Sequence, residues 1–376
     1  YNWSLPDVSN EEYFGLIRNF RSNAPVLLYL FGASPVVCSS FLEARAHALQ
    51  PLGESSLYLP YATSLRMGRL GYQSDAQSTL AVSYNDLDGY GASLQEALTQ
   101  PYPAYETVGV RNPGGDYNQL STTLLQIENE FYGTIRPKRT VFSGERPLHA
   151  LRERGVQYVE VRCMDLDPFE PLGISAATAR FLDVFLLHCL LTDSPPDSPE
   201  EIEVLKRNQN LAAERGREPG LLLRRGERET TLAQWSAELI AECAVIAQRL
   251  DAETGTPLHT ESLENAAALA QDPSRLPSTR VLAAIRNEHD GSFMDFVRAQ
   301  SLSLREAALA HPPTAEQVAR FAEASTLSFE VQREVEARDT MPFEIYRQQY
   351  LLPSRLGLRP RSAEPEFTQV AGAAAL

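Results

Sequence analysis

The sequence has 376 residues, of which 43% are hydrophobic, and its 34 Lys and Arg against 49 Asp and Glu give a formal net charge of −15. That length suffices for one large globular unit or two, and the acidic balance argues against nucleic acid or an anionic membrane as a general partner. The two most apolar stretches, residues 24–37 and 181–191, are shorter than the ~20 residues that a membrane-spanning helix needs.

Residues 1–193 mix helical, turn and strand patterns. Residues 10–19 and 26–32 predict helices, the first with Ser9 as N-cap and Glu12 completing a capping box. Further along, four segments have a clear pattern: a turn at residues 112–116, strands at residues 123–131 and 157–164, and a short helix at residues 144–154.

The sequence becomes plainly helical after a breaker of sequence Ser-Pro-Pro-Asp-Ser-Pro at residues 194–199. Apolar residues then recur at steps of three and four, which predicts helices at residues 200–215, 231–250, 261–271, 278–287 and 314–336. We therefore expect the α+β class, with residues 1–193 as an α+β domain, residues 194–363 as a helical region and residues 364–376 as a disordered, Ala-rich tail.

The strongest chemical signal lies in residues 157–165, of sequence QYVEVRCMD. In a strand, Tyr158, Glu160 and Arg162 share one face, because alternate side chains point the same way. An ordinary solvated ion pair explains such a pattern in most strands. The functional interpretation is a Mg²⁺ ligand, Glu160, beside a cation for a phosphoryl group, Arg162.

Two further clusters carry charge or aromatic groups. If the strand that begins at residue 123 reaches Tyr132, then Gln126, Glu128, Glu130 and Tyr132 share a face, and Arg136, Lys138 and Arg139 follow as a basic patch suited to nucleotide phosphates. A charged surface strand is the alternative. Residues 58–72 combine three tyrosines with two arginines, which suits capture of an amino-acid substrate or an ordinary packed loop.

The cysteines and histidines give no comparable signal. Four scattered cysteines without a CxxC pair predict a reducing, cytoplasmic location rather than a disulfide framework or structural zinc. The six histidines show no HxH or HExxH spacing, so we expect structural or surface roles for all of them.

Five longer motifs together resemble one family. The strings YNWSLP, YLFGASPVVCSSF, YLPYATSLRMGRLGY, LQIENEFYGTIRPKR and VQYVEVRCMDLDPFEPLGI look like glutamate–cysteine ligase (γ-glutamylcysteine synthetase) of the γ-proteobacterial type. The resemblance implies a glutamine-synthetase-like catalytic sheet and an ATP-dependent ligase that opens glutathione synthesis. ATP would phosphorylate the γ-carboxylate of glutamate, and the amine of cysteine would displace phosphate.

The resemblance also implies roles for single residues. Glu160 is expected to bind Mg²⁺, Arg162 to contact the transferred phosphoryl group, and Arg66, Tyr72 and Tyr132 to line the substrate pocket, with both tyrosines around cysteine. Arg136 and Lys138 near the nucleotide phosphates is an inference from charge alone. The partners are then glutamate, cysteine and ATP, without nucleic acid or membrane.

The sequence departs from the family at its front. Relatives carry an N-terminal section with further metal-binding carboxylates and a metal-binding His just before the Tyr-Asn that opens this chain. None of this is present before Tyr1, so we expect an N-terminally truncated fragment with an incomplete catalytic sheet that is inactive or nearly so by itself. Another carboxylate–amine ligase of the same superfamily, or a non-catalytic binding remnant, is the alternative.

Overall fold

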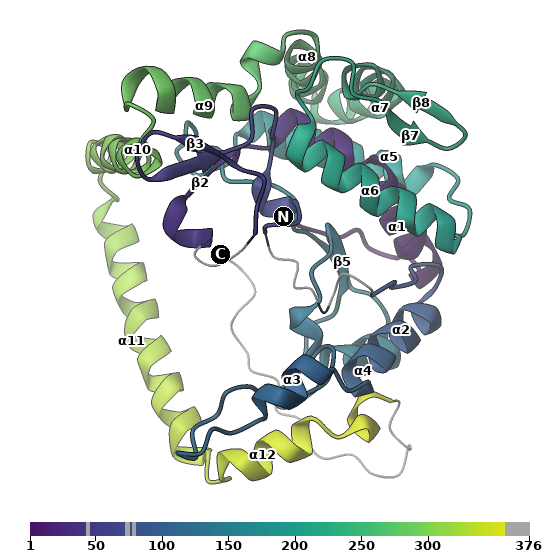
Figure 1. The fold of residues 1–376 in the computed structure, drawn as a ribbon, viewed down its shortest axis with the longest axis vertical. Helices are drawn as coiled ribbons and strands as arrows, with labels where there is room; N and C mark the ends of the chain where they lie inside the picture. Colours follow the sequence, from purple (N-terminus) through teal and green to yellow (C-terminus); the bar gives the residue numbers. More distant parts are fainter. Residues whose placement is uncertain (43–45, 72–75, 77–79, 358–376) are drawn as a thin grey trace.

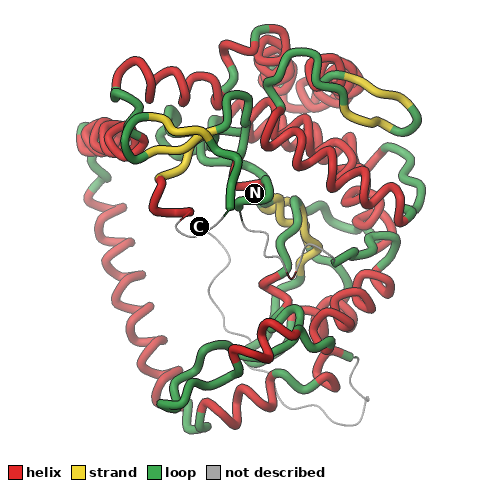
Figure 2. Tube along the Cα trace, viewed as in Figure 1, coloured by secondary structure: helices red, strands yellow, loops and turns green. Residues whose placement is uncertain are grey.

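The computed structural model describes residues 1–42, 46–71, 76 and 80–357. The expected disordered tail at residues 364–376 and the candidate residue Tyr72 therefore lie outside the described residues. The described part is mainly helical, with three small antiparallel sheets, and this confirms the α+β class (Figures 1 and 2).

The first long helix, α1 (Asn10–Phe31), begins at the expected cap. Ser9 Oγ accepts a hydrogen bond from the Glu12 N–H at 3.2 Å, and Glu12 Oε2 accepts one from the Ser9 N–H at 2.7 Å. The prediction of two helices is wrong, because α1 continues through Pro25. A helical proline costs ~3 kcal/mol, which several buried residues after it, each contributing about 1.5–3 kcal/mol, offset. These are Val26, Leu27, Leu28 and Leu30.

The helices expected after residue 199 are present, with ends within a few residues of the prediction. They are α6 (Pro199–Arg215), α7 (Leu232–Thr254), α8 (Leu258–Gln271), α9 (Pro277–Glu288) and α11 (Ala315–Arg338). Four helices in the described part of the chain have no counterpart among the predicted ones: α2 (Leu87–Thr99), α3 (Pro103–Val108), α10 (Phe293–Leu309) and α12 (Phe343–Tyr350). The apolar stretch at residues 181–191 belongs to a further helix, α5 (Ala176–Leu191). The expected short helix is α4 (Pro147–Arg154).

One hydrophobic core joins the two halves of the chain. Phe14 and Phe20 of α1, Phe185 of α5, Trp235 of α7 and Leu263 of α8 belong to the same buried cluster. In Figure 1, α1, α5, α6, α7 and α8 accordingly lie together as one layer. The division of the chain at residues 193 and 194 stays a prediction.

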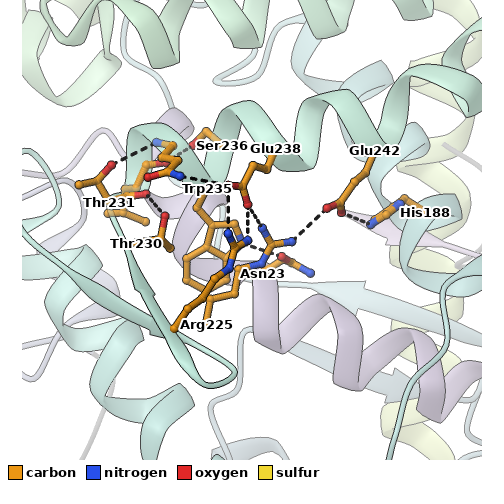
Figure 3. Close-up of polar contacts among 12 residues, drawn as sticks. Asn23, His188, Arg225, Thr230, Thr231, Trp235, Ser236, Glu238 and Glu242 are labelled. Atoms are coloured by element: carbon orange, nitrogen blue, oxygen red, sulfur yellow. Dashed lines mark hydrogen bonds and ion pairs between the residues drawn. The ribbon is translucent and has the colours of Figure 1, made fainter.

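A polar cluster at the edge of this layer ties the hairpin of β7 (Leu223–Arg225) and β8 (Arg228–Thr230) to the helices (Figure 3). Arg225 Nη1 lies 2.7 Å from Glu238 Oε2, and the Arg225 guanidinium lies 5.4 Å from the centre of the Trp235 ring. Trp235 in turn donates from Nε1 to Asn23 Oδ1 of α1 at 2.9 Å. The buried indole N–H is thus satisfied, and these contacts are structural.

The described residues also form two three-stranded sheets. One has the order β1-β6-β5, from β1 (Asn2–Trp3), β5 (Ile135–Lys138) and β6 (Tyr158–Val161). The other has the order β2-β4-β3, from β2 (Val36–Cys38), β3 (Gln50–Leu52) and β4 (Ser56–Tyr58). The first sheet carries the candidate site.

The last described residues, 343–357, pack against the first half of the chain. Every residue of α11 is exposed, and the helix runs from α10 to α12 along one side of the molecule (Figure 1). The segment that follows docks on α4, because Arg146 Nη1 donates to the Tyr350 carbonyl at 2.8 Å and Arg152 Nη1 to the Leu356 carbonyl at 2.7 Å. Among the described residues no helix has both the length and the apolar character of a membrane span.

Candidate functional site

The two faces of β6 differ as the alternation predicts. Val159 and Val161 are buried in the core, while Tyr158 and Glu160 are half-buried on the opposite, polar face. The regular strand is shorter than expected, since it ends at Val161, and Arg162 follows it directly. The prediction that Glu160 and Val159 face opposite sides is confirmed.

The neighbouring strand β5 adds two cations to the polar face. Arg136 pairs directly with Glu160 across the ladder, and Lys138 pairs with Tyr158, so their side chains share that face. Glu160 Oε2 lies 3.2 Å from Arg162 Nη1 and 3.5 Å from Lys138 Nζ. One carboxylate is thus surrounded by three cations.

The charges on this face shift the pKa of several groups. Burial raises the pKa of the Glu160 carboxyl, but Lys138 and Arg162 outweigh it, so that the pKa lies below its ordinary value. Burial and the charge of Arg162 lower the pKa of the Arg136 guanidinium. Because the cations outnumber the carboxylate, the polar face favours binding of an anion.

Two further features suit a phosphate. Arg136 is 4% exposed, and its Nε has no hydrogen-bond partner among the described residues. Buried donors normally have a partner, so this N–H is a candidate donor to a ligand. The Tyr132 ring lies 5.5 Å from the Arg136 guanidinium and 5.4 Å from that of Arg162, which brings Tyr132 to the same face.

Arg66 contacts the segment that follows β6. Its Nε donates to Asp165 Oδ1 at 2.8 Å, and its Nη2 donates to the carbonyl oxygens of Arg162 at 3.1 Å and Met164 at 2.8 Å. Arg66 therefore holds the main chain that carries Arg162. Its expected contact with substrate stays a prediction.

Asp165 is the residue that the sequence analysis missed. Its carboxylate is 3% exposed and accepts hydrogen bonds from the Ala33 N–H at 2.9 Å, Ser34 Oγ at 2.7 Å and Ser64 Oγ at 3.0 Å, besides Arg66. A signal was present in the alternation, because position 165 has the inward parity of Val159 and Val161. An ionisable residue there indicates a buried charge with partners.

We expect Asp165→Asn to lower the free energy of unfolding by about 2–3 kcal/mol, because hydrogen bonds to charged groups contribute ~1.5–3 kcal/mol and an amide N–H₂ faces donors here. Urea denaturation measures this effect. Asp339→Asn, at an exposed position after α11, is the matched control and should change the value by less than ~0.5 kcal/mol. Equal stabilities of the two variants would contradict the proposed role of Asp165.

The predicted strand at residues 123–131 is wrong. This segment is a loop with a 3₁₀ turn at Glu128–Glu130, and its backbone pairs with the end of α2, where the Leu125 N–H donates to the Ala97 carbonyl at 2.9 Å. Glu128 consequently does not share a face with Tyr132. It is buried against Arg146, at 2.7 Å between Oε2 and Nη2.

A metal ion finds few ligands on the polar face itself. Within the described ranges, no group of three or more His, Cys, Asp or Glu ligand atoms includes Glu160. Mg²⁺ is commonly held by one or two carboxylates together with substrate phosphates. Glu160 fits such a shared site, as the one carboxylate beside an anion.

Comparison with known proteins identifies relatives over most of the chain. Residues 2–212 match the family described as glutamate-cysteine ligase. The glutamate–cysteine ligase of Janthinobacterium sp. (strain Marseille) is 47% identical over 343 residues, which cover 91% of this chain and 64% of that protein. That of Pseudomonas fluorescens (strain Pf-5) is 44% identical over 92% of this chain and 68% of its own length.

Two solved structures are similar to this chain. The glutamate–cysteine ligase of Francisella tularensis in complex with AMP is similar with a TM-score of 0.83 and 33% identity, over 92% of this chain and 68% of that one. A bifunctional glutathione synthetase from Pasteurella multocida, at 23% identity and a TM-score of 0.53 over 79% of this chain and 32% of that one, is alike in fold only.

Proposed function

This chain belongs to the glutamate–cysteine ligase family, and we propose that it takes part in the ATP-dependent ligation of glutamate to cysteine, the first step of glutathione synthesis. In this reaction a γ-carboxylate oxygen of glutamate attacks the γ-phosphorus of ATP, and ADP leaves. The amine of cysteine then attacks the carbonyl carbon of γ-glutamyl phosphate. Phosphate leaves, the ammonium loses a proton, and a γ-peptide bond remains.

The observation that supports this proposal best is the excess of cations around Glu160. Phosphoryl transfer depends on positioning and on neutralising the negative charge spread over phosphate oxygens. We assign Arg162 to the transferred phosphoryl group, because its planar guanidinium matches two phosphate oxygens. Arg136 and Lys138, on the same face, are assigned to the other nucleotide phosphates.

Glu160 is assigned as a Mg²⁺ ligand within this arrangement. Mg²⁺ shared between Glu160 and phosphate oxygens would neutralise charge that develops on those oxygens. The side chains nearest to Glu160 are cationic, so the other ligand oxygens would come from the phosphates and from the N-terminal section proposed below.

We place the amino-acid substrates beside this face. The Tyr132 ring lies near the guanidiniums of both Arg136 and Arg162, and with Tyr72 it is proposed to close around cysteine. Arg66 is proposed to act at the same pocket, although its described contacts are to Asp165 and the main chain. This arrangement would orient the cysteine amine toward the acyl phosphate.

The relatives that this chain matches are longer than the chain itself. The chain spans 64% of the Janthinobacterium protein and 68% of the Pseudomonas protein, so the activity of a whole ligase is itself a proposal here. We propose that a glutamine-synthetase-like sheet is completed, and further metal ligands are supplied, by an N-terminal section of the kind that relatives carry. Residues 1–376 alone are then expected to be inactive or nearly so.

Two proteins test the proposal: residues 1–376, and a chimera with the N-terminal section of the Janthinobacterium relative placed before Tyr1. We expect the chimera with Mg-ATP to release phosphate only when glutamate and cysteine are both present, and to form γ-glutamylcysteine. The chain alone should show little turnover. Thermal melting of both proteins controls for folding.

The other outcomes separate the alternatives. Strong turnover by residues 1–376 alone would contradict the need for further residues. A chimera that accepts other amines as well as cysteine would indicate a different carboxylate–amine ligase. ATP binding by both proteins without turnover in either would indicate a binding remnant.

A further inference from the structure

A second cluster of ionisable groups is formed by His149 and Glu153 of α4 and by Glu145, which directly precedes the N-cap of that helix. Glu145 and His149 are 4% and 3% exposed, and the Glu153 side chain is 40% exposed. His149 and Glu153 are four residues apart on the helix and hence on one face. One ligand atom from each of the three residues lies within 4.8 Å of the others.

The surroundings of His149 fix which ring nitrogen carries the proton. Nδ1 lies 2.5 Å from the Gly357 carbonyl oxygen, which can only accept, so Nδ1 is the donor. In the neutral ring Nε2 then presents a lone pair. Nε2 is buried without a hydrogen-bond partner in the described part of the chain, and it faces Glu153 Oε2 at 3.3 Å and Glu145 Oε1 at 3.9 Å.

Three acceptor atoms that face one another are stabilised by a nearby positive charge, and Arg154 supplies one to the two carboxylates but none to Nε2. A proton on Nε2 would draw a carboxylate oxygen to about 2.7–2.9 Å, as in other charge-assisted hydrogen bonds, and neither contact is that short. A tetrahedral ion with bonds of about 2.0–2.2 Å separates its ligand atoms by roughly 3.3–3.6 Å. The observed spacings are closer to those of a tetrahedral ion.

Arg154 occupies only part of the carboxylate capacity. It bonds Glu145 through Nη1 to Oε1 at 2.7 Å and Nη2 to Oε2 at 2.8 Å, and its Nη1 lies 3.1 Å from Glu153 Oε2. Each carboxylate oxygen has a second lone pair. One guanidinium against two carboxylates leaves a net negative charge, which suits a cation.

We propose that Glu145, His149 and Glu153 bind a divalent transition-metal ion of the zinc class. Imidazole nitrogen selects such ions over Mg²⁺ and Ca²⁺. The Nδ1–H bond to a backbone carbonyl is the usual second-shell contact of a metal-binding histidine. The exposed side of Glu153 leaves room for a water as fourth ligand. Through Gly357, the ion stabilises docking of the segment after α12 onto α4.

Titration of residues 1–376 with Zn²⁺ by calorimetry, and with Co²⁺ by visible absorption, tests the proposal without any activity measurement. We expect one site of high affinity, a Co²⁺ spectrum typical of four-coordinate N/O ligation, and no comparable Mg²⁺ binding. Glu153→Gln and His149→Gln should each weaken Zn²⁺ binding by at least about 10–100-fold, since even loss of a second-shell partner has an effect of that size.

Replacing the buried His149 can disturb folding, whereas the Glu153 side chain is 40% exposed. Glu153→Gln therefore tests the metal site in a folded protein. Glu334→Gln, on the exposed helix α11, is the matched control and should leave Zn²⁺ affinity unchanged. If wild-type protein and Glu153→Gln bind Zn²⁺ equally, or if neither binds it, the metal site is refuted.

Discussion

We expect Arg162→Ala to lower the kcat of the γ-glutamylcysteine-forming chimera by about 10²-fold or more, with a smaller change in the KM for ATP. The guanidinium is proposed to contact the phosphoryl group as it leaves ATP, so its interaction strengthens toward the transition state. Loss of one such electrostatic stabiliser typically costs about 10²–10³ in kcat. Steady-state kinetics at saturating glutamate and cysteine measures the effect.

Two controls separate this role from a structural one. Arg162→Lys should recover only part of the loss, because a point charge does not reproduce the planar donors of a guanidinium. Arg338→Ala removes an exposed ion-pair arginine on α11 and should leave kcat unchanged. If Arg162 only pairs with Glu160, its removal costs at most about 1 kcal/mol of stability, and kcat in the folded variant stays normal.

The helices after residue 199 are predictable because their signals are local. Ser198 and Thr314 begin α6 and α11 with complete capping boxes, and Thr231 caps α7. Apolar residues at steps of three and four then mark the buried faces of α7, α8 and α9. Such patterns need no knowledge of the partner surface. On α11 the same periodicity predicts a helix whose residues are all exposed.

The loop at residues 123–131 shows where local pattern fails. Its alternation of β-branched and polar residues resembles a strand, but its backbone groups form hydrogen bonds with side chains instead of with a neighbouring strand. Gln126 Oε1 accepts from the Leu120 N–H at 2.6 Å, and Thr123 Oγ1 donates to the Leu125 carbonyl at 2.7 Å. Such side-chain hydrogen bonds compete with strand pairing, and the sequence pattern alone does not show which of the two forms.

Some features of the candidate site are likewise predictable from local pattern, and others are not. The common face of Tyr158, Glu160 and Arg162 follows from the period of a strand. The register that sets Arg136 opposite Glu160 depends on pairing between strands, and the four donors around Asp165 come from two segments far from it in the sequence, residues 33–34 and 64–66. Tertiary contacts of this kind become visible only once the chain is folded.

We expect Glu128→Ala to lower the free energy of unfolding by about 3–5 kcal/mol, as for loss of one partner from a buried ion pair. Glu128 and Arg146 have side chains 5% and 1% exposed. Arg146 donates to Glu128 Oε2 from Nε at 2.9 Å and from Nη2 at 2.7 Å. Without the carboxylate, the buried guanidinium keeps a single hydrogen bond among the described residues, from Nη1 to the Tyr350 carbonyl. Urea denaturation measures the loss.

A double-mutant cycle with Arg146→Met tests the cause. Removing both charges eliminates the uncompensated guanidinium, and replacing buried ion pairs by apolar groups is often neutral or stabilising. We therefore expect the double variant Glu128→Leu/Arg146→Met to be more stable than Glu128→Leu alone or Arg146→Met alone. If the two effects simply add, the energy lies in packing rather than charge. A change below ~0.5 kcal/mol for Glu128→Ala would mean that water reaches Arg146, and that the pair does not hold the loop at residues 123–131 against α4.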